Sequence, residues 1–357
     1  MRILNAMFGR KKGGIEQAFI DYSKSLHDLG CNVTALAYQD APIINSLPKE
    51  IEVRSITNFG QWDPLAVWKL KKIIKEINPD VIVTHGNRAT TLLNKAINNI
   101  PVVTVCHNYN VKQMGDCKTL ITVTEDLRKS IIKKGGDGDN IYTIPNMVYL
   151  PADLKLRNYV MHEPPVIGAM GRFVTKKGFN VYLRALSILR NRGVNFRAIL
   201  GGAGTDLEKL KKLAENLAIM DIVSFPGWIE DKEEFFSSID LFCVPSLHEP
   251  FGIVILEAFM HSVPIIATDT EGPMEIIKPH INGMIVEAGE ADALADAMER
   301  LIKNPKAAER ISKEGFETVT NIYDSKMVGK KLYQILEKVI NTHKENMPAE
   351  TESMMIE

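Results

Sequence analysis

Short apolar runs alternate with amphipathic stretches along almost the whole chain. Residues 3–6, 33–37 and 81–84 have the length and the apolar side chains of buried strands, whereas residues 15–29 and 64–77 repeat apolar positions every three to four residues, as helices do. In the first half the pattern also predicts strands at 102–106, 120–123 and 141–144 and helices at 89–98 and 125–134. Strands that alternate with helices in this way indicate a parallel sheet flanked by helices.

The pattern stops at residues 147–165, which contain three prolines and little periodicity, and then starts again. In the second half it predicts strands at 166–170, 197–200, 222–225, 241–244 and 264–267, helices at 178–192, 205–217 and 232–238, and closing helices at 292–303, 305–320 and 325–341. We therefore predict an α/β protein with two doubly wound, Rossmann-like domains, at 1–160 and 161–324, and a polar tail at 347–357. A length of 357 residues suits two domains better than one.

The charge is nearly balanced overall but is uneven along the chain. A formal net charge of −1 argues against a nucleic-acid-binding protein, which is normally basic. Residues 1–164 carry 21 Lys and Arg against 16 Asp and Glu, whereas the remainder carries 22 against 28, so the first half is the better candidate to face an anionic partner. No apolar run approaches the ~20 residues of a membrane span, and the four cysteines have no paired spacing. We expect a cytoplasmic protein with reduced thiols.

Residues 246–259 follow an apolar strand and become a helix at about Gly252. The Pro-Phe-Gly turn leaves backbone N–H groups free at the start of that helix, where phosphates commonly bind. Glu249 lies on the turn and Glu257 lies about a turn into the helix, so two carboxylates accompany the expected phosphate site. A helix with both carboxylates in solvent is the plainer interpretation of these residues alone.

Other polar residues follow strands in the same way, and ligands of open α/β sheets bind at the carboxyl ends of the strands. Arg172 and Lys177 lie between a strand and a helix, where cations oppose the helix dipole unless an anion is bound. Residues 201–204 lack the spacing of a dinucleotide-binding loop, so a tight turn is the preferred interpretation. The first half contributes Gly14, His85 and His107 at strand ends.

Two groups of residues suggest metal sites without having the expected geometry. Cys106 and His107 are neighbours on an extended segment, so their side chains point to opposite faces and do not readily share one ion with Cys117. Asp137 and Asp139 precede a strand, which places them at the wrong end of the sheet for a ligand and favours a surface turn. We therefore expect no metal.

Together these residues resemble the retaining, nucleotide-sugar-dependent glycosyltransferases of group one (family four), which have the GT-B fold. The resemblance runs from Gly13-Gly14 and His107 to Gly171-Arg-Phe-x-x-x-Lys-Gly178 and the pair Glu249-x₇-Glu257, and it covers nearly the whole chain. It implies two domains that face each other across a cleft, with the helix at 325–341 returning to the first. The implied reaction moves a hexose to a hydroxyl of a glycan or lipid-linked acceptor, as in lipopolysaccharide, other surface polysaccharide or glycolipid synthesis.

The resemblance also implies roles for individual residues. Arg172 and Lys177 would bind the donor diphosphate, Glu257 the ribose hydroxyls, and Glu249 the transferred sugar, which His107 would approach from the first domain. The remaining implied residues are Gly14, Gly202, Phe251, Gly252 and Ile253 on the donor side and Arg10, Lys11, Lys12 and Asn146 on the acceptor side. The nucleotide sugar is a co-substrate, so the resemblance implies neither a cofactor nor a metal.

The chain departs from the family pattern at three positions. Ser262 and Met147 stand where Gly is common, and Glu271-Gly272 replaces a frequent Gly-Gly. Because Glu271 is the change expected nearest the donor sugar, it leaves the identity of that sugar open. An epimerase of the same fold, which needs no acceptor, and a non-catalytic nucleotide-binding subunit are the alternative functions.

A basic helix with two tryptophans adds a candidate membrane contact. Trp62 and Trp68 occur together with lysines at 69, 71, 72 and 75, a composition that suits the surface of an anionic bilayer. Burial of both tryptophans in the core would instead leave an ordinary solvated helix face. The resemblance favours peripheral docking of the first domain on the inner face of the membrane, next to a lipid-anchored acceptor.

Overall fold

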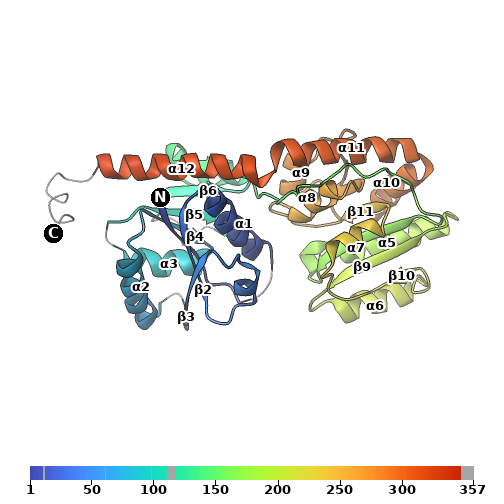
Figure 1. The fold of residues 1–357 in the computed structure, drawn as a ribbon. Coiled ribbons are helices and arrows are strands. Elements are labelled where there is room, and N and C mark those ends of the chain that lie inside the picture. The colour runs from blue at the N-terminus through green and yellow to red at the C-terminus, as the bar shows by residue number, and fades with distance from the viewer. Residues whose placement is uncertain (11–12, 61, 98, 111–116, 347–357) are drawn as a thin grey trace. The chain divides into compact units, whose positions relative to one another are not determined.

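The structure, a computed structural model, describes residues 1–10, 13–60, 62–97, 99–110 and 117–346. The chain divides into two compact units, which are unit 1, Met1–Tyr149 with Ser325–Glu357, and unit 2, Leu150–Asp324. Each unit has one parallel sheet flanked by helices, so the predicted pair of doubly wound α/β domains is confirmed (Figure 1). Within the described residues, no helix is both long and apolar enough to span a membrane.

Unit 1 contains a seven-stranded sheet in the order β3-β2-β1-β4-β5-β6-β7. Its strands are β1 (Arg2–Met7), β2 (Asn32–Tyr38), β3 (Glu52–Ile56), β4 (Val81–His85), β5 (Val102–Cys106), β6 (Thr119–Thr122) and β7 (Ile141–Thr143). Its helices are α1 (Gly14–Asp28), α2 (Pro64–Ile77), α3 (Asn87–Ala96), α4 (Glu125–Lys133) and α12 (Ser325–Glu345), with 3₁₀ turns at Pro42–Ser46 and Gly138–Asn140.

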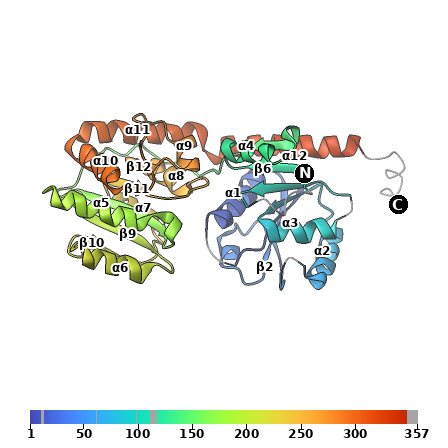
Figure 2. The same ribbon diagram turned by 180° about the vertical axis from the view of Figure 1, so that it is seen from behind.

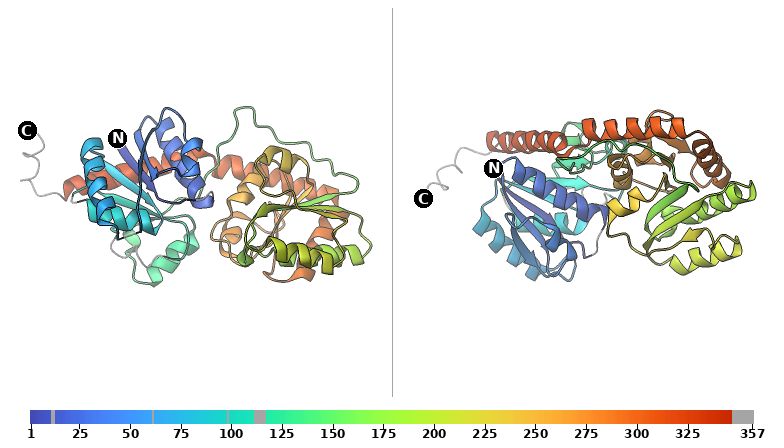
Figure 3. Two further views of the ribbon diagram at one scale, coloured as in Figure 1. Left: turned by 90° about the horizontal axis from the view of Figure 1, so that it is seen from below. Right: turned by 45° about the vertical axis from the view of Figure 1, so that its right-hand side comes forward.

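The two faces of the unit 1 sheet bury different partners. Leu4 and Ala6 of β1 belong to an apolar core with residues of α2 and α3. Side chains alternate along a strand, so Asn5 points to the opposite face, where its Nδ2 donates to the Phe19 carbonyl of α1 at 3.0 Å. Helix α12 packs along α1 on that face (Figures 1 and 3). The polar Asn5 therefore lies in the layer between the sheet and α1.

Unit 2 contains a six-stranded sheet in the order β10-β9-β8-β11-β12-β13. Its strands are β8 (Val166–Arg172), β9 (Arg197–Ala203), β10 (Val223–Ser224), β11 (Leu241–Val244), β12 (Ile265–Thr268) and β13 (Met284–Val286). Its helices are α5 (Phe179–Asn191), α6 (Leu207–Asn216), α7 (Lys232–Ser237), α8 (Ile253–Met260), α9 (Glu271–Ile276), α10 (Ala291–Lys303) and α11 (Pro305–Ile322), with a 3₁₀ turn at Thr175–Lys177.

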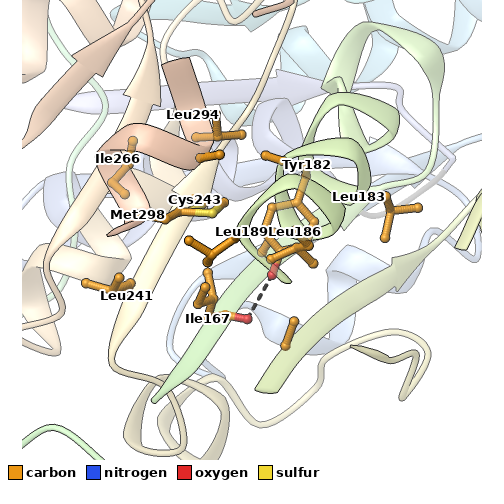
Figure 4. Close-up of a cluster of buried hydrophobic side chains, with 14 of the residues drawn as sticks. Ile167, Tyr182, Leu183, Leu186, Leu189, Leu241, Cys243, Ile266, Leu294 and Met298 are labelled. Atoms are coloured by element: carbon orange, nitrogen blue, oxygen red, sulfur yellow. Dashed lines mark hydrogen bonds between the residues drawn. The ribbon is translucent and has the colours of Figure 1, made fainter. Parts of the chain in front are cut away.

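The core of unit 2 lies between its central strands and the helices α5 and α10, which contact each other (Figure 2). Leu186 and Leu189 of α5 meet Ile167 of β8 and Leu241 of β11 in this core, as Figure 4 shows. Tyr182 brings a hydroxyl into the same layer and donates it to the Ile167 carbonyl at 2.8 Å. This hydrogen bond ties α5 to the end of β8 that lies away from Arg172.

Residues 150–160, which the sequence pattern places with the first domain, lie with unit 2. The backbone N–H of Arg157 donates to Ser262 Oγ at 3.1 Å, and the Tyr159 hydroxyl donates to the Asp240 carbonyl at 3.2 Å. This segment has no hydrophobic periodicity, so the sequence does not show which domain it packs against. The tail at 347–357 lies outside the described residues.

Candidate active site

The basic turn after β8 is held against the segment that follows β11. Gly178 ends this turn with φ +65°, and a Cβ at its position would lie 1.8 Å from the Pro245 carbonyl oxygen. The Leu247 N–H donates to the Lys176 carbonyl at 2.8 Å. These contacts bring Lys177 to Glu249, with which it forms an ion pair. This contact is consistent with the prediction that side chains following neighbouring strands lie close together.

The turn carries an excess of positive charge. Arg172, Lys176 and Lys177 lie within one short segment, and of these three only Lys177 forms an ion pair with a described residue, Glu249. Burial lowers the pKa of Lys176, as do the like charges of Lys177 and Arg172, while Glu249 opposes them. Crowded cations of this kind are stabilised when an anion binds.

Helix α8 begins beside this cluster without a side-chain cap. Gly252 is its N-cap with φ +96°, and no described side chain accepts a hydrogen bond from the first turn, which Ile253 begins. The preceding Phe251 is buried, and its backbone is packed so closely that a Cβ on Gly272 would lie 2.2 Å from the Phe251 carbonyl oxygen. The Gly272 N–H also donates to the Glu249 carbonyl at 2.8 Å. The turn is thus fixed before any ligand arrives.

Glu257 lies in the second turn of α8 and is buried. Its Oε1 forms an ion pair with Lys232 Nζ at 2.6 Å, and its Oε2 is buried with no hydrogen-bond partner among the described residues. An unpartnered buried carboxylate oxygen is costly, so a donor from a ligand would be accommodated readily here. Lys232 begins α7 and carries no sequence feature that marks it as a partner of Glu257.

Two glycines at the end of β9, Gly202 in the strand and Gly204 directly after it, have a structural role. A Cβ on Gly202 would lie 1.9 Å from the Gly171 carbonyl oxygen, and a Cβ on Gly204 would lie 2.4 Å from that of Phe173. Both glycines have φ in the range that other residues rarely adopt, +146° and +156°. They allow the ends of β8 and β9 to approach closely, as the interpretation of a tight turn requires. Contact of Gly202 with a donor stays a prediction.

Two of the residues that depart from the family pattern, Glu271 and Ser262, have defined contacts in the structure. Glu271 Oε1 lies 2.9 Å from Nδ1 of His248, and its Oε2 is buried without a described partner. Ser262 has φ +54°, a left-handed conformation that explains why Gly is frequent at this position. Its carbonyl accepts a hydrogen bond from Ser312 Oγ at 2.7 Å. The Glu271–His248 contact lies directly before Gly272, whose N–H donates to the Glu249 carbonyl.

In unit 1, His107 follows β5 and is half-buried. Its Nε2 lies 2.9 Å from Nδ1 of His85, whose Nε2 lies 3.0 Å from Oδ1 of Asn5. Burial lowers the pKa of His107 to about 4, and burial together with the neighbouring His107 holds the pKa of His85 well below its ordinary value. Strand-end position identified both histidines, but it did not identify their contact or Asn5.

The remaining predicted residues of unit 1 occupy varied environments. Gly14 is the first residue of α1. Arg10 donates from Nη2 to the Asn58 carbonyl at 2.9 Å, and its guanidinium lies 4.2 Å from the centre of the Tyr38 ring. Asn146 is buried, and its Oδ1 has no partner among the described residues. Lys11 and Lys12 lie outside the described residues.

Asp137 and Asp139 form a surface turn, as expected. Asp137 accepts hydrogen bonds from the backbone N–H of Asp139 at 3.1 Å and from Asn140 Nδ2 at 2.7 Å. Asp139 also lines a cavity of about 980 Å³ at the entry ends of β5 and β6, where Val102 and Thr119 begin these strands. Across the described ranges, no group of three His, Cys, Asp or Glu side chains is placed to hold a metal ion.

Trp62 and Trp68 are exposed, by 69% and 64%, so the interpretation that buries them in the core is wrong. The buried side chains of α2 are instead Ala66, Leu70 and Ile74, which repeat every four residues. The Trp62 ring lies on the surface with Lys95 Nζ 3.6 Å from its centre.

Comparisons with known proteins agree with this architecture. The chain matches the family model described as Glycosyltransferase Family 4 over residues 12–150 and the model described as Glycosyl transferases group 1 over residues 157–318. It is 25% identical over 354 residues to the lipopolysaccharide core biosynthesis glycosyltransferase LpsE of Rhizobium meliloti, covering 94% of this chain and 99% of that one. A second Rhizobium meliloti protein with the same description, LpsD, is 26% identical over 92% of this chain and 96% of its own length.

Solved structures share the fold over the same extent. The crystal structure of Anabaena Alr3699/HepE in complex with UDP and glucose superposes with a TM-score of 0.81, at 21% sequence identity, over 95% of this chain and 100% of that one. The two family models lie side by side along the chain, and each covers one of the Rossmann-like sheets described above. The chain therefore belongs to the group 1 glycosyltransferases and has the GT-B fold.

Proposed function

We propose that the protein transfers a hexose from a nucleotide diphosphate sugar to a hydroxyl group, with retention of the anomeric configuration and without a metal ion. The observation that carries the proposal is the concentration of Arg172, Lys176 and Lys177 beside the uncapped start of α8. Cleavage of the sugar–phosphate bond places negative charge on the leaving diphosphate. Fixed cations and helix-end N–H groups stabilise such charge without a metal ion.

Glu249 and Glu257 suit the hydroxyl-bearing parts of the same donor. Glu257 offers a buried Oε2 to a hydroxyl donor, as a ribose would supply, and Lys232 already neutralises its charge. Glu249 is fixed on the turn and is paired with Lys177, so a donor diphosphate that attracts Lys177 would free the carboxylate for the transferred sugar. In this assignment His107 is also a sugar-contacting residue.

The nucleotide base is best identified by binding. The Anabaena protein was crystallised with UDP, whereas a Mycobacterium tuberculosis relative, 27% identical over 54% of this chain, is described as GDP-mannose-dependent. We would measure the thermal unfolding midpoint with UDP, GDP, ADP and their sugars, because a ligand that binds the native state raises this midpoint. We expect one base to give the largest shift and the Arg172→Ala variant to lose most of it. No shift with any nucleotide would refute the proposal.

The acceptor is proposed to be a glycan or a lipid-linked glycan. The Rhizobium meliloti relatives, described as lipopolysaccharide core glycosyltransferases, favour a core oligosaccharide. With the identified donor and a lipopolysaccharide core acceptor, NMR of the product should show the anomeric configuration of the donor. Incubation with the donor alone separates transfer from epimerisation. Formation of an epimeric nucleotide sugar without an acceptor would favour the epimerase.

We infer that unit 1 also docks on an anionic membrane. Phe59, Trp62, Leu65 and Trp68 are 96%, 69%, 67% and 64% exposed, although they are large and apolar. Leu65 and Trp68 lie three residues apart on the outer face of α2, which also carries exposed lysines at 69, 71, 72 and 75. Aromatic and aliphatic side chains among lysines match the interface of an anionic bilayer, to which each cation adds about 1 kcal/mol.

Liposome co-sedimentation tests this surface. We expect binding to vesicles with anionic lipid that weakens with salt and when the four α2 lysines are changed to Glu. Trp68→Ala should weaken binding, whereas Trp228→Ala, at a 45% exposed tryptophan of unit 2, should not. Absence of sedimentation at low salt would indicate a soluble acceptor instead.

A further inference from the structure

A line of polar side chains crosses the apolar face between the sheet of unit 1 and α1. In the parallel register Met7 of β1, His85 of β4 and Val105 of β5 are neighbours. Side chains two residues apart on a strand share a face, so Asn5, His85 and His107 point to the same side of the sheet. They form a continuous chain, with 3.0 Å between Asn5 Oδ1 and His85 Nε2 and 2.9 Å between His85 Nδ1 and His107 Nε2.

The amide of Asn5 can have only one orientation. Its Nδ2 lies 3.0 Å from the Phe19 carbonyl oxygen, which only accepts hydrogen bonds, and 2.9 Å from Ser23 Oγ. The Ser23 hydroxyl proton is itself donated to the Phe19 carbonyl at 2.9 Å, so Ser23 Oγ accepts from Asn5. The two protons of Asn5 Nδ2 are therefore both used. Its Oδ1 faces His85 as an acceptor.

This orientation determines the protons of both imidazoles. His85 Nε2 faces an acceptor and must carry a proton, so Nδ1 of neutral His85 is an acceptor. His107 Nε2 faces that acceptor and must donate to it. The rings of Tyr22 and Phe19 lie nearly perpendicular to the His85 ring, with ring centres 5.0 Å and 5.9 Å away, and they fix its plane. Burial also keeps both histidines neutral, because it lowers the pKa of each.

We propose that Asn5 and His85 are positioning residues that hold His107 as the Nε2–H tautomer, so that its Nδ1 accepts a hydrogen bond from a hydroxyl group of the sugar substrate. The inference rests on the proposed function for the identity of the ligand, but the tautomer itself follows from contacts within unit 1. Among the described residues, none forms a hydrogen bond with Nδ1 of His107.

The tautomer sets the chemistry available at this position. A lone pair at Nδ1 accepts from a hydroxyl and repels a carbonyl or carboxylate oxygen, so a substrate oxidised to a keto or uronic form at the contacted carbon would bind poorly. A neutral imidazole that donates its proton to His85 also has none to give to a departing group. His107 therefore selects and orients the sugar and is not a general acid.

The tautomer is measured directly on the wild-type protein labelled with ¹⁵N-histidine. Long-range ¹H–¹⁵N correlation spectra distinguish an Nε2–H imidazole from an Nδ1–H imidazole and from imidazolium, and His107→Gln assigns the signal. We expect neutral Nε2–H at pH 7 for His107 and for His85. An Nδ1–H or charged His107 would overturn the proposal, whether or not the protein transfers a sugar.

Variants test whether His85 imposes this state. His85→Phe keeps the ring volume and removes the acceptor, so we expect a mixed tautomer at His107 and a loss of about tenfold to a hundredfold in kcat, with unchanged nucleotide affinity. His85→Asn offers an amide oxygen near the position of Nδ1 and should restore most of the activity and the tautomer. Thr84→Val is the matched control, because it removes buried hydrogen bonds to Thr90 and Thr104 on the same strand without touching His107.

The outcomes separate the proposal from the assigned function. The proposal fails if His85→Phe, folded as shown by its circular dichroism, retains the wild-type tautomer or a kcat within about twofold of wild type. It also fails if Thr84→Val lowers kcat as much as His85→Phe. The expected tautomer in a protein that transfers no sugar would leave the positioning intact and refute the proposed function instead. If His85→Phe does not fold, the spectrum of the wild-type protein and the tautomer and kcat of His85→Asn still test the proposal.

Discussion

Substitution of Gly178 by Ala tests whether the basic turn is held in place by backbone contact. Gly178 has φ +65°, and an added Cβ would lie 1.8 Å from the Pro245 carbonyl oxygen, where real contacts stay above 3.0 Å. The left-handed conformation costs roughly 1–2 kcal/mol in a residue with a Cβ. The turn must also move by about 1.2 Å, which adds roughly 1–3 kcal/mol as overpacking does. We therefore expect Gly178→Ala to lower the free energy of unfolding by about 2–5 kcal/mol in total.

Gly193 provides the matched control. It follows α5 with φ +79°, and a Cβ at its position would meet no atom within 4 Å. Gly193→Ala should therefore lower the free energy of unfolding only by the cost of the left-handed conformation, roughly 1–2 kcal/mol. Trp228 is the tryptophan of unit 2, so its fluorescence during urea unfolding reports on this unit once Trp62 and Trp68 are replaced by Phe.

The same displacement should affect the donor site. Moving the turn stretches the 2.8 Å hydrogen bond from the Leu247 N–H to the Lys176 carbonyl and separates Lys177 from Glu249. Gly178→Ala should therefore also weaken nucleotide binding, whereas Gly193→Ala should leave it unchanged. Equal destabilisation by the two substitutions, or unchanged nucleotide affinity in Gly178→Ala, would refute the reasoning.

Four further outcomes follow. Arg172→Ala should cost about 2–4 kcal/mol in kcat/KM for the donor, and turnover within about threefold of wild type would contradict its contact with the diphosphate. Glu249→Gln should keep nucleotide affinity and lose transfer, whereas Glu257→Ala should lose nucleotide affinity; calorimetry that finds equal affinities would argue against these separate roles. The pKa values of His107 and His85 in the folded protein lie below 6.5, so the unfolded chain takes up protons first as the pH drops. The free energy of unfolding should therefore fall between pH 6.5 and about 4, by up to about 1.4 kcal/mol per pH unit for each histidine. The thermal unfolding midpoint of His107→Gln should decline less with falling pH than that of the wild type. An identical decline would speak against the lowered pKa of His107. Turnover should survive a chelator; complete loss that magnesium or manganese restores would show a metal requirement.

The architecture was predictable because its central strands are strongly apolar. β1, β4 and β5 are buried over nearly their whole length, which leaves a clear signal in sequence. β3 was not predictable, since it is an edge strand in which only Ile56 is buried, and β13 is only three residues long. Short or half-solvated strands carry little hydrophobic pattern.

The candidate site was predictable where the chemistry follows a strand end. That rule placed the segments of Lys177 and Glu249 at the same edge of the sheet, and the structure brings the two side chains into contact. Their roles toward a donor stay predictions. Lys232 was missed because its pairing with Glu257 depends on how α7 and α8 pack, which no local pattern records. Asn5 was missed because it looks like an interruption of an apolar strand until the register aligns it with the histidines.

Unit 1 is built from two separated segments of the chain, which affects the order in which the units are synthesised and where the chain can be cut. Unit 2 is continuous in sequence, so a ribosome has made all of it before it makes α12, the helix that completes unit 1. The Ser325 N–H donates to the Val148 carbonyl at 2.9 Å, so the chain leaves unit 1 and returns to it at neighbouring points. A short loop from Tyr149 to Ser325 would therefore give unit 1 as a single uninterrupted polypeptide. A cut after Asp324 would instead leave unit 2 intact and strip α1 of the helix that covers Ser25.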